Sequence, residues 1–344
     1  MKSNDIFLAI TGLPRHLHML KQQIHELKNH NKVSKNKIVP IYFIREDLID
    51  DNFQYFLNEL DVKIQIIPKI DKRTLMALDS KYGTRVDTTR VNGGLAKASL
   101  WKQLIDIRSV LGLLPKDAYV IRTRTDILIR GKELLRISNL DWIEKRRHSV
   151  DCKISERIHI LWASTTIPFY MHDVVFSGKV SELVKFINNE NFDTLAPHYP
   201  PYAFPSFFWI GPFLHHKDIE NWLKKFNSSR PKMRYMKDLK FATTYNLYYQ
   251  ILFENFYIDS LNVEWCLSFA PYDGIIVKRI WKRYNFRYGL FFHLICFKFK
   301  YSIGAIESDI ELTRFFEKNE TYISSLHLLN SLKSRLLSLN IFGR

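Results

Sequence analysis

The chain has 344 residues, of which 46% are hydrophobic and 25% charged, and its formal net charge at pH 7 is +16. This composition excludes an intrinsically disordered chain and suffices for one large α/β domain or for two domains. The three cysteines stand at unrelated spacings, which argues against a disulfide framework or a zinc site and suits a reducing compartment. No uncharged apolar stretch reaches the roughly 18 residues of a membrane-spanning helix.

The first 70 residues alternate between apolar strands and helices. Residues 5–11, 37–44 and 62–67 are predicted strands, and 53–60 is a predicted short helix. A longer helix after the first strand is predicted from apolar residues at helical spacing, namely Leu17, Leu20, Ile24 and Leu27. Strands that alternate with helices indicate a parallel sheet with right-handed crossovers. No glycine-rich dinucleotide fingerprint and no P-loop follows the first strand, which argues against those two nucleotide-binding classes.

Thr11 and Gly12 end the first predicted strand. Ligands of open parallel sheets bind at the carboxyl ends of the strands, and a glycine there lets a nucleotide approach the backbone closely. The alternative is an ordinary turn that ends a strand. Both interpretations stay open from the sequence.

Three charges interrupt an otherwise apolar strand predicted over residues 119–129. Because strand side chains alternate between faces, Arg122, Arg124 and Asp126 are expected to point the same way. Buried charges are costly unless they are paired or bound to a ligand. One interpretation is a site for an anionic ligand, with Asp126 holding a metal ion or a sugar hydroxyl. The other is an internal arginine–aspartate salt bridge that only stabilises the strand.

Three further residues outside this strand are candidates for chemistry. A helix is predicted over 95–113, and Lys97 in its first turn would attract phosphate, although a lone lysine is more often simply solvated. Asp173 lies inside the apolar run 167–178, as either a catalytic carboxylate or a turn residue. Asp238 opens a helix predicted over 238–256.

The rest of the second half follows the same mixed pattern. A strand is predicted over 158–162, helices over 181–188 and 326–339, and a proline-rich loop over 197–212.

A basic and aromatic window lies near the C-terminus. Residues 274–306 contain no aspartate or glutamate, and 278–300 contains seven lysines and arginines among many aromatic residues. This mixture suits the anionic headgroup region of a membrane, and equally a solvated basic face beside an aromatic core segment. No nucleic-acid-binding motif is found, so nucleic acid is not expected as a partner.

Two segments resemble a known family. Residues 119–126 (Tyr-Val-Ile-Arg-Thr-Arg-Thr-Asp) are similar to the central strand of WavE-type lipopolysaccharide biosynthesis proteins, and 168–178 is similar to that family's Pro-aromatic-x-x-[Ser]-Asp-x-x-aromatic-x-Gly segment. The resemblance covers roughly residues 5–180. The chain departs from the family at 92–96, where Asn-Gly-Gly-Leu-Ala replaces Asn-x-x-Arg-Gln.

The resemblance implies a GT-A-like α/β fold, in which a Rossmann-like mixed or parallel sheet is flanked by helices, followed here by a helical, basic C-terminal region. It also implies transfer of a sugar from a nucleotide-sugar donor to a growing cell-surface glycan, such as lipopolysaccharide or capsule. The acceptor would be a glycan or a lipid-linked glycan. We expect residues 1–265 to form the donor and acceptor domain and 266–344 the C-terminal region.

The chemistry of such a transfer sets requirements for the site. The leaving diphosphate must be stabilised by a divalent ion, Mg²⁺ or Mn²⁺, or by arginine and lysine. The usual Asp-x-Asp signature has Arg124 in its first position here, so only Asp126 remains as a metal ligand, and both arrangements stay open. The expected donor-binding residues are Thr11, Gly12, Lys97, Arg122, Arg124, Thr125 and Asp126. Asp173 and then Asp238 are the candidate general bases for an inverting transfer.

The predicted location follows from the charge. A cytoplasmic enzyme that docks peripherally on the anionic inner face of the cytoplasmic membrane fits the basic window. Two other functions stay open: a sugar-phosphate transferase of surface-polysaccharide synthesis, and a non-enzymatic protein that binds membranes peripherally.

Overall fold

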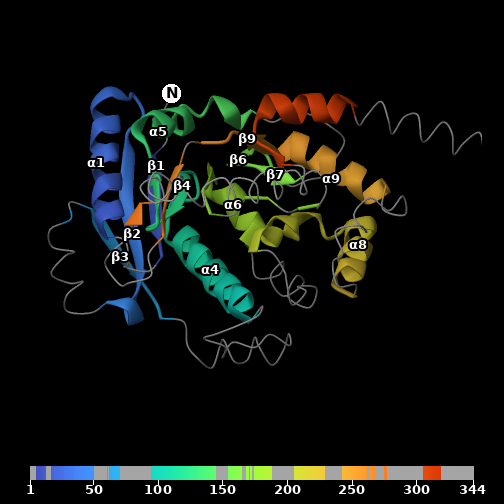
Figure 1. The fold of residues 1–344 in the computed structure, drawn as a ribbon, viewed down its shortest axis with the longest axis horizontal. Helices are drawn as coiled ribbons and strands as arrows, with labels where there is room; N and C mark the ends of the chain where they lie inside the picture. Colours follow the sequence, from blue (N-terminus) through green and yellow to red (C-terminus); the bar gives the residue numbers. More distant parts are fainter. Residues whose placement is uncertain are drawn as a thin grey trace, which may run out of the picture.

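The computed structural model of the chain describes residues 5–12, 17–49, 60, 62–69, 94–144, 154–164, 168–169, 171–172, 174–187, 205–228, 242–261, 263–267, 275–276 and 305–318. Within them a mixed, mostly parallel sheet has helices on both faces (Figure 1). This arrangement confirms the predicted α/β class with a mixed sheet flanked by helices.

The central sheet has seven strands in the order β3-β2-β1-β4-β8-β6-β9. Strands β3, β2, β1 and β4 are mutually parallel, β8 is antiparallel to β4 and β6, and β9 is parallel to β6. Their bounds are β1 Ile6–Thr11, β2 Ile38–Arg45, β3 Lys63–Ile67, β4 Tyr119–Arg124, β6 Ile158–Ile160, β8 Phe176–Lys179 and β9 Phe256–Ile258. The three strands predicted in the first 70 residues and the strand predicted near 158 are thereby confirmed.

The two main helices of the N-terminal half cover opposite faces of the sheet. Helix α1 (Leu17–Val33) packs Leu20, Ile24 and Leu27 against the face that carries Ile6 and Leu8 of β1. Helix α4 (Gly94–Leu113) lies on the other face, and Figure 1 shows α1 and α4 on opposite sides of strands β1 to β3. Both helices confirm the predictions made from apolar spacing.

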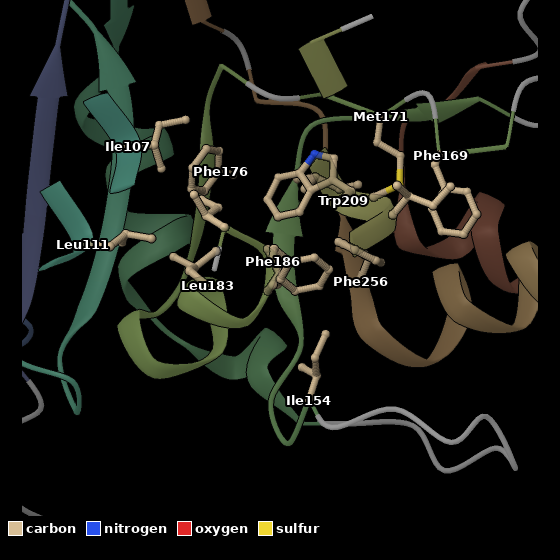
Figure 2. Packing of buried hydrophobic residues seen from close by; sticks show 14 of the residues in the cluster. Ile107, Leu111, Ile154, Phe169, Met171, Phe176, Leu183, Phe186, Trp209 and Phe256 are labelled. Atoms are coloured by element: carbon tan, nitrogen blue, oxygen red, sulfur yellow. The ribbon is translucent and has the colours of Figure 1, made fainter. Parts of the chain in front are cut away.

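The α4 face holds the larger core, and aromatic residues from distant parts of the chain meet there. The ring of Trp209 lies edge-on against Phe176, Phe186 and Phe256, with ring centroids 5.2, 5.2 and 5.7 Å away (Figure 2). These rings come from a 3₁₀ helix η4 (Pro205–Phe213), from β8, from α6 (Val180–Ile187) and from β9. Burial of such large apolar surfaces ties the second half of the chain to the sheet.

The proline-rich segment differs from its prediction. Residues 205–213 form the 3₁₀ helix η4 rather than a loop, because its apolar residues Trp209, Ile210 and Phe213 are fully buried. Helices α6 and α9 (Ala242–Asn255) confirm the helices predicted over 181–188 and 238–256. Helix α8 (Lys217–Ser228) lies between η4 and α9 in the chain.

Part of the C-terminal region also joins the core. Strand β12 (Ala305–Ile306) pairs with β7 (Ala163–Ser164), and Leu312 in the helical segment 309–318 is fully buried. The predicted helices over 53–60 and 326–339 and the basic window 278–300 lie outside the described residues, so the division at residue 265 stays a prediction. No helix in the described part of the chain is both long and apolar enough to cross a membrane.

The strand predicted over 119–129 is wrong as a single element. β4 ends at Arg124, a turn follows, and β5 (Ile127–Ile129) pairs instead with β10 (Val263–Leu267), which also pairs with β11 (Ile275–Ile276). The strand stops because β1, its neighbour on one side, ends at Thr11 opposite Arg124. On the other side, β8 begins opposite Arg122. Asp126 therefore lies in a turn and does not share a strand face with the two arginines.

Candidate functional site

The sheet has a reversal of strand order between β1 and β4. From β1 the chain builds β2 and β3 on one side and then returns to place β4 on the other. In open α/β sheets ligands bind outside the carboxyl ends of the strands at such a reversal. Thr11 is the register partner of Arg124, so the ends of β1 and β4 meet there. Six residues predicted from the sequence converge on this edge: Thr11, Gly12, Arg122, Arg124, Thr125 and Asp126.

Backbone hydrogen bonds hold the two strand ends together. The N–H of Thr125 donates to the carbonyl of Thr11 at 2.9 Å, and the Thr11 hydroxyl donates to the carbonyl of Thr123 at 3.3 Å. Gly12 has φ +119°, and a Cβ there would lie 3.0 Å from Oγ1 of Thr125. The hydroxyl of Tyr42 donates to the Gly12 carbonyl at 3.3 Å. Gly12 is therefore needed both for its backbone conformation and for its lack of a side chain.

Arg124 and Asp126 form a two-point ion pair across the turn. Nε of Arg124 donates to Oδ1 of Asp126 at 2.8 Å, and Nη2 donates to Oδ2. The side chain of Arg124 is 34% exposed and that of Asp126 16%. The internal salt bridge considered from the sequence is thus present. It does not decide whether a ligand also binds, because a guanidinium has a second edge of N–H donors.

Arg122 occupies a different environment from Arg124, although both project from the same face of β4. Arg122 is 3% exposed, its Nη1 donates to the carbonyl of Val174 at 2.6 Å, and its guanidinium carbon lies 5.9 Å from the ring centroid of Phe176. Arg122 therefore ties β4 to the segment that precedes β8. Contact of Arg122 with a ligand stays a prediction.

His172 lies in that same segment and was not identified from the sequence. Nδ1 of His172 accepts the N–H of Val175 at 3.2 Å. Burial, with a smaller contribution from the positive charges of Arg122 and Arg124, lowers the pKa of His172 to about 4. A neutral imidazole is thus part of the carboxyl edge at neutral pH. The low pKa of His172 depends on its burial and on its nearness to two arginines. Neither property can be predicted from the amino-acid sequence alone.

Arg45 is a second residue that the sequence analysis missed. It ends β2 on the same face as Phe43, which is the register partner of Thr11. Arg45 is 8% exposed, and its Nε lies 3.6 Å from Oδ1 of Asp47. It stands two strands from Arg124, about 10 Å across the sheet. The predicted strand ended at Ile44, one residue too early. Extending its alternation by one residue would have placed Arg45 on the same face as Phe43.

The remaining predicted residues are only partly placed. Helix α4 ends just before β4 and the turn at Pro115, so its first turn, with Lys97, lies toward the carboxyl edge. Asp173 and Asp238 lie outside the described residues. The neighbours of Asp173, His172 and Val174, lie at the carboxyl edge beside Arg122.

A metal ion at Asp126 does not fit the donor set. Both carboxylate oxygens of Asp126 already accept from Arg124, so a divalent ion would have to displace a cation and then sit beside it. In the described ranges, no three histidine, cysteine, aspartate or glutamate side chains come together as metal ligands. Among the described side chains, Arg122 and Arg124 bring positive charge to this edge.

The comparisons with known proteins add little to this geometry. No protein-family model matches the chain, and no curated protein matches it. The solved apo structure of mouse xyloside xylosyltransferase 1 is similar to it with 10% identity and a TM-score of 0.31, over 62% of this chain and 82% of that chain. This similarity is too low to identify a fold family or an activity.

Proposed function

We propose that the protein is a glycosyltransferase whose nucleotide-sugar donor binds at the carboxyl ends of β1 and β4. The observation that carries the proposal is the convergence of Gly12, Thr125 and Arg124 where the strand order reverses. This is the position at which open α/β sheets bind nucleotides. A GT-A-like fold would account for the mostly parallel sheet.

The site chemistry suits a diphosphate. Gly12 presents backbone without a side chain, and Arg124 supplies a partly exposed guanidinium beside it. As the bond between the sugar C1 and the diphosphate oxygen breaks, the leaving group gains negative charge, which a preorganised arginine stabilises. Arg122 and Lys97 would add positive potential at the same edge, and Arg122 would do so from a buried position.

The acceptor half of the reaction rests on the sequence. In an inverting transfer the acceptor oxygen forms the new bond to C1 and its proton passes to a general base. Asp173 is the first candidate because its two neighbours flank the edge beside Arg122, and Asp238 is the second. The acceptor class proposed from the WavE-type resemblance is a growing cell-surface glycan, free or lipid-linked.

The proposed location also rests on the sequence. Docking on the anionic inner face of the cytoplasmic membrane would use the basic window 278–300. Vesicle co-sedimentation tests it: binding should require anionic lipid and weaken as salt rises.

Donor turnover tests the proposed function. Purified protein is incubated with UDP-, GDP- and dTDP-sugars, with and without Mn²⁺, and release of the nucleoside diphosphate is measured. CMP-sugars, which have a single phosphate, are the matched comparison. We expect one diphosphate donor class to be hydrolysed slowly without acceptor, and faster with a glycan acceptor. No release from any donor, with or without acceptor glycans, would contradict the proposal.

A further inference from the structure

We infer that Asp126 is a positioning residue, which fixes the guanidinium of Arg124 so that its outer edge is presented to a phosphate anion, and that it is not a metal ligand. The inference rests on the proposed function, because it concerns the same diphosphate site. It assigns Asp126 a role different from the metal ligation expected from the sequence. Three features of the described residues carry it.

The first feature is which edge of Arg124 is occupied. Asp126 accepts from Nε and from Nη2, and Arg124 has no other hydrogen-bond partner in the part of the chain that the structure describes. The two terminal nitrogens form a second fork of N–H donors with the geometry that phosphate oxygens accept. The pair with Asp126 therefore leaves the phosphate-binding edge available and fixes its plane.

The second feature is the relative depth of the two side chains. Asp126 is the less exposed partner, at 16% against 34% for Arg124. Arg124 is therefore the partner that is more accessible to an anion from solvent. A carboxylate that competed for the same edge would need to be displaced first.

The third feature is the rigidity of the backbone that carries the pair. Arg124 is the register partner of Thr11, and the N–H of the intervening Thr125 is bonded to the Thr11 carbonyl. Immediately after Asp126, Ile127 pairs with Trp265 of β10. Both ends of the turn are thus held by sheet hydrogen bonds. A guanidinium fixed in this way loses less rotamer freedom when it binds an anion.

The first experiment needs no ligand. The Nε–H resonance of Arg124 is followed in a nitrogen-15 NMR spectrum of the whole protein, assigned by its disappearance in Arg124→Lys. We expect a protected signal in the wild type that exchanges rapidly with water in Asp126→Asn, with the thermal melting curve unchanged. An equally protected signal in Asp126→Asn would show that Asp126 does not hold the guanidinium and would overturn the inference.

The second experiment uses inorganic pyrophosphate as the probe, titrated by calorimetry with Mg²⁺ or with EDTA. We expect Asp126→Asn to weaken binding about tenfold, equally in both buffers. Arg124→Met should weaken binding further, and the double variant should bind no worse than Arg124→Met alone. Such non-additivity is the signature of a residue that acts through its neighbour.

Three results of the titration would overturn the inference. Tighter binding by Asp126→Asn would mean that the carboxylate competes with the anion. A loss confined to the Mg²⁺ buffer, or persisting in the Arg124→Met background, would mean that Asp126 is a metal ligand. The third result is that the wild type binds no pyrophosphate although the NMR result is as expected. Asp126 would then orient Arg124, but the proposed diphosphate site would be contradicted, and with it the inference that depends on that site.

Discussion

Arg124 and Arg130 lie six positions apart, and their ion pairs serve different purposes in this fold. Arg124 bonds one carboxylate, that of Asp126, within its own turn. Arg130 bonds two carboxylates from distant parts of the chain: Glu26 of α1, through Nη1 at 2.6 Å, and Glu264 of β10, through Nε and Nη2 at 3.1 and 2.9 Å. The two arginines are almost equally exposed, at 34% and 31%. Exposure alone therefore does not separate them.

The difference lies in what each pair connects. Arg130 precedes α5 (Gly131–Ser138) and joins it to α1 and β10, and the second oxygen of Glu26 accepts the N–H of Gly131 at 2.8 Å. Burial would raise the pKa of Glu26, but the bonds from Arg130 and Gly131 outweigh it and lower that pKa overall. A pair that joins distant elements stabilises the fold, whereas one within a turn sets the orientation of a side chain.

The largest expected change in stability comes from two buried histidines and not from either arginine pair. Because this change occurs at acidic pH, the two arginines should be compared at neutral pH. Burial lowers the pKa of His159 to about 3 and that of His172 to about 4. In the unfolded chain both take up protons near pH 6.5, so stability is lost as pH falls below that value. Below that pH each histidine should cost up to about 1.4 kcal/mol per pH unit, which gives about 4 kcal/mol for the two between pH 7.5 and 5.

Urea unfolding at pH 7.5 and pH 5 measures this loss. His159→Phe, which keeps an aromatic ring beside Trp142 and Tyr257, should remove about half of it, since each histidine contributes comparably. An unfolding free energy that is the same at both pH values would contradict the prediction. The two arginines are then compared at pH 7.5.

The next largest effect should come from Arg130. Arg130→Met removes the guanidinium that bonds both Glu26 and Glu264, and Glu264 is only 8% exposed. Removing one partner of a largely buried ion pair is strongly destabilising, so the free energy of unfolding should fall by about 3 kcal/mol. Chemical denaturation of Arg130→Met and Arg124→Met in parallel gives the comparison. An equal loss of unfolding free energy in both variants would show that Arg130 does not stabilise the fold more than Arg124 does, although its pair joins distant elements.

A smaller effect is expected at the turn beside Arg124. Gly12→Ala must place a side chain at φ +119° and only 3.0 Å from Oγ1 of Thr125. The variant should lose about 2 kcal/mol of unfolding free energy. Adding Thr125→Ala should relieve the contact but leave the backbone strain. Gly112→Ala in α4 is the matched control, because a Cβ there meets nothing within 4 Å, and it should not destabilise. Full stability of Gly12→Ala would contradict the role given to this glycine.

The smallest change in stability is expected for Arg124→Met. A partly exposed pair that joins only residues of one turn contributes less than about 1 kcal/mol. The same variant should lose most of its affinity for pyrophosphate, which Arg130→Met, to the extent that it remains folded, should retain. If Arg124→Met unfolds the protein but the folded fraction still binds pyrophosphate, the roles of the two arginines are reversed.

The elements of the sheet were predictable because apolar spacing dictates them locally. The predictions over 5–11, 17–27 and 95–113 needed only alternation and helical period. The end of β4 at Arg124 was not predictable, because it depends on where β1 and β8 stop beside it. For the same reason the sequence could place Arg122, Arg124 and Asp126 near one another but could not tell which of them pair.

Direct binding of a nucleotide sugar tests the central proposal most closely. Calorimetric titration of the wild type with UDP-, GDP-, dTDP- and CMP-sugars is compared with Arg124→Met and with Arg108→Met, which removes an exposed arginine from the second half of α4. The proposed site predicts that a diphosphate sugar binds the wild type and Arg108→Met alike, is displaced by pyrophosphate, and binds Arg124→Met at least about tenfold more weakly. Equal affinity of all three proteins for that sugar, or no binding of any diphosphate sugar, would contradict a donor site at the ends of β1 and β4.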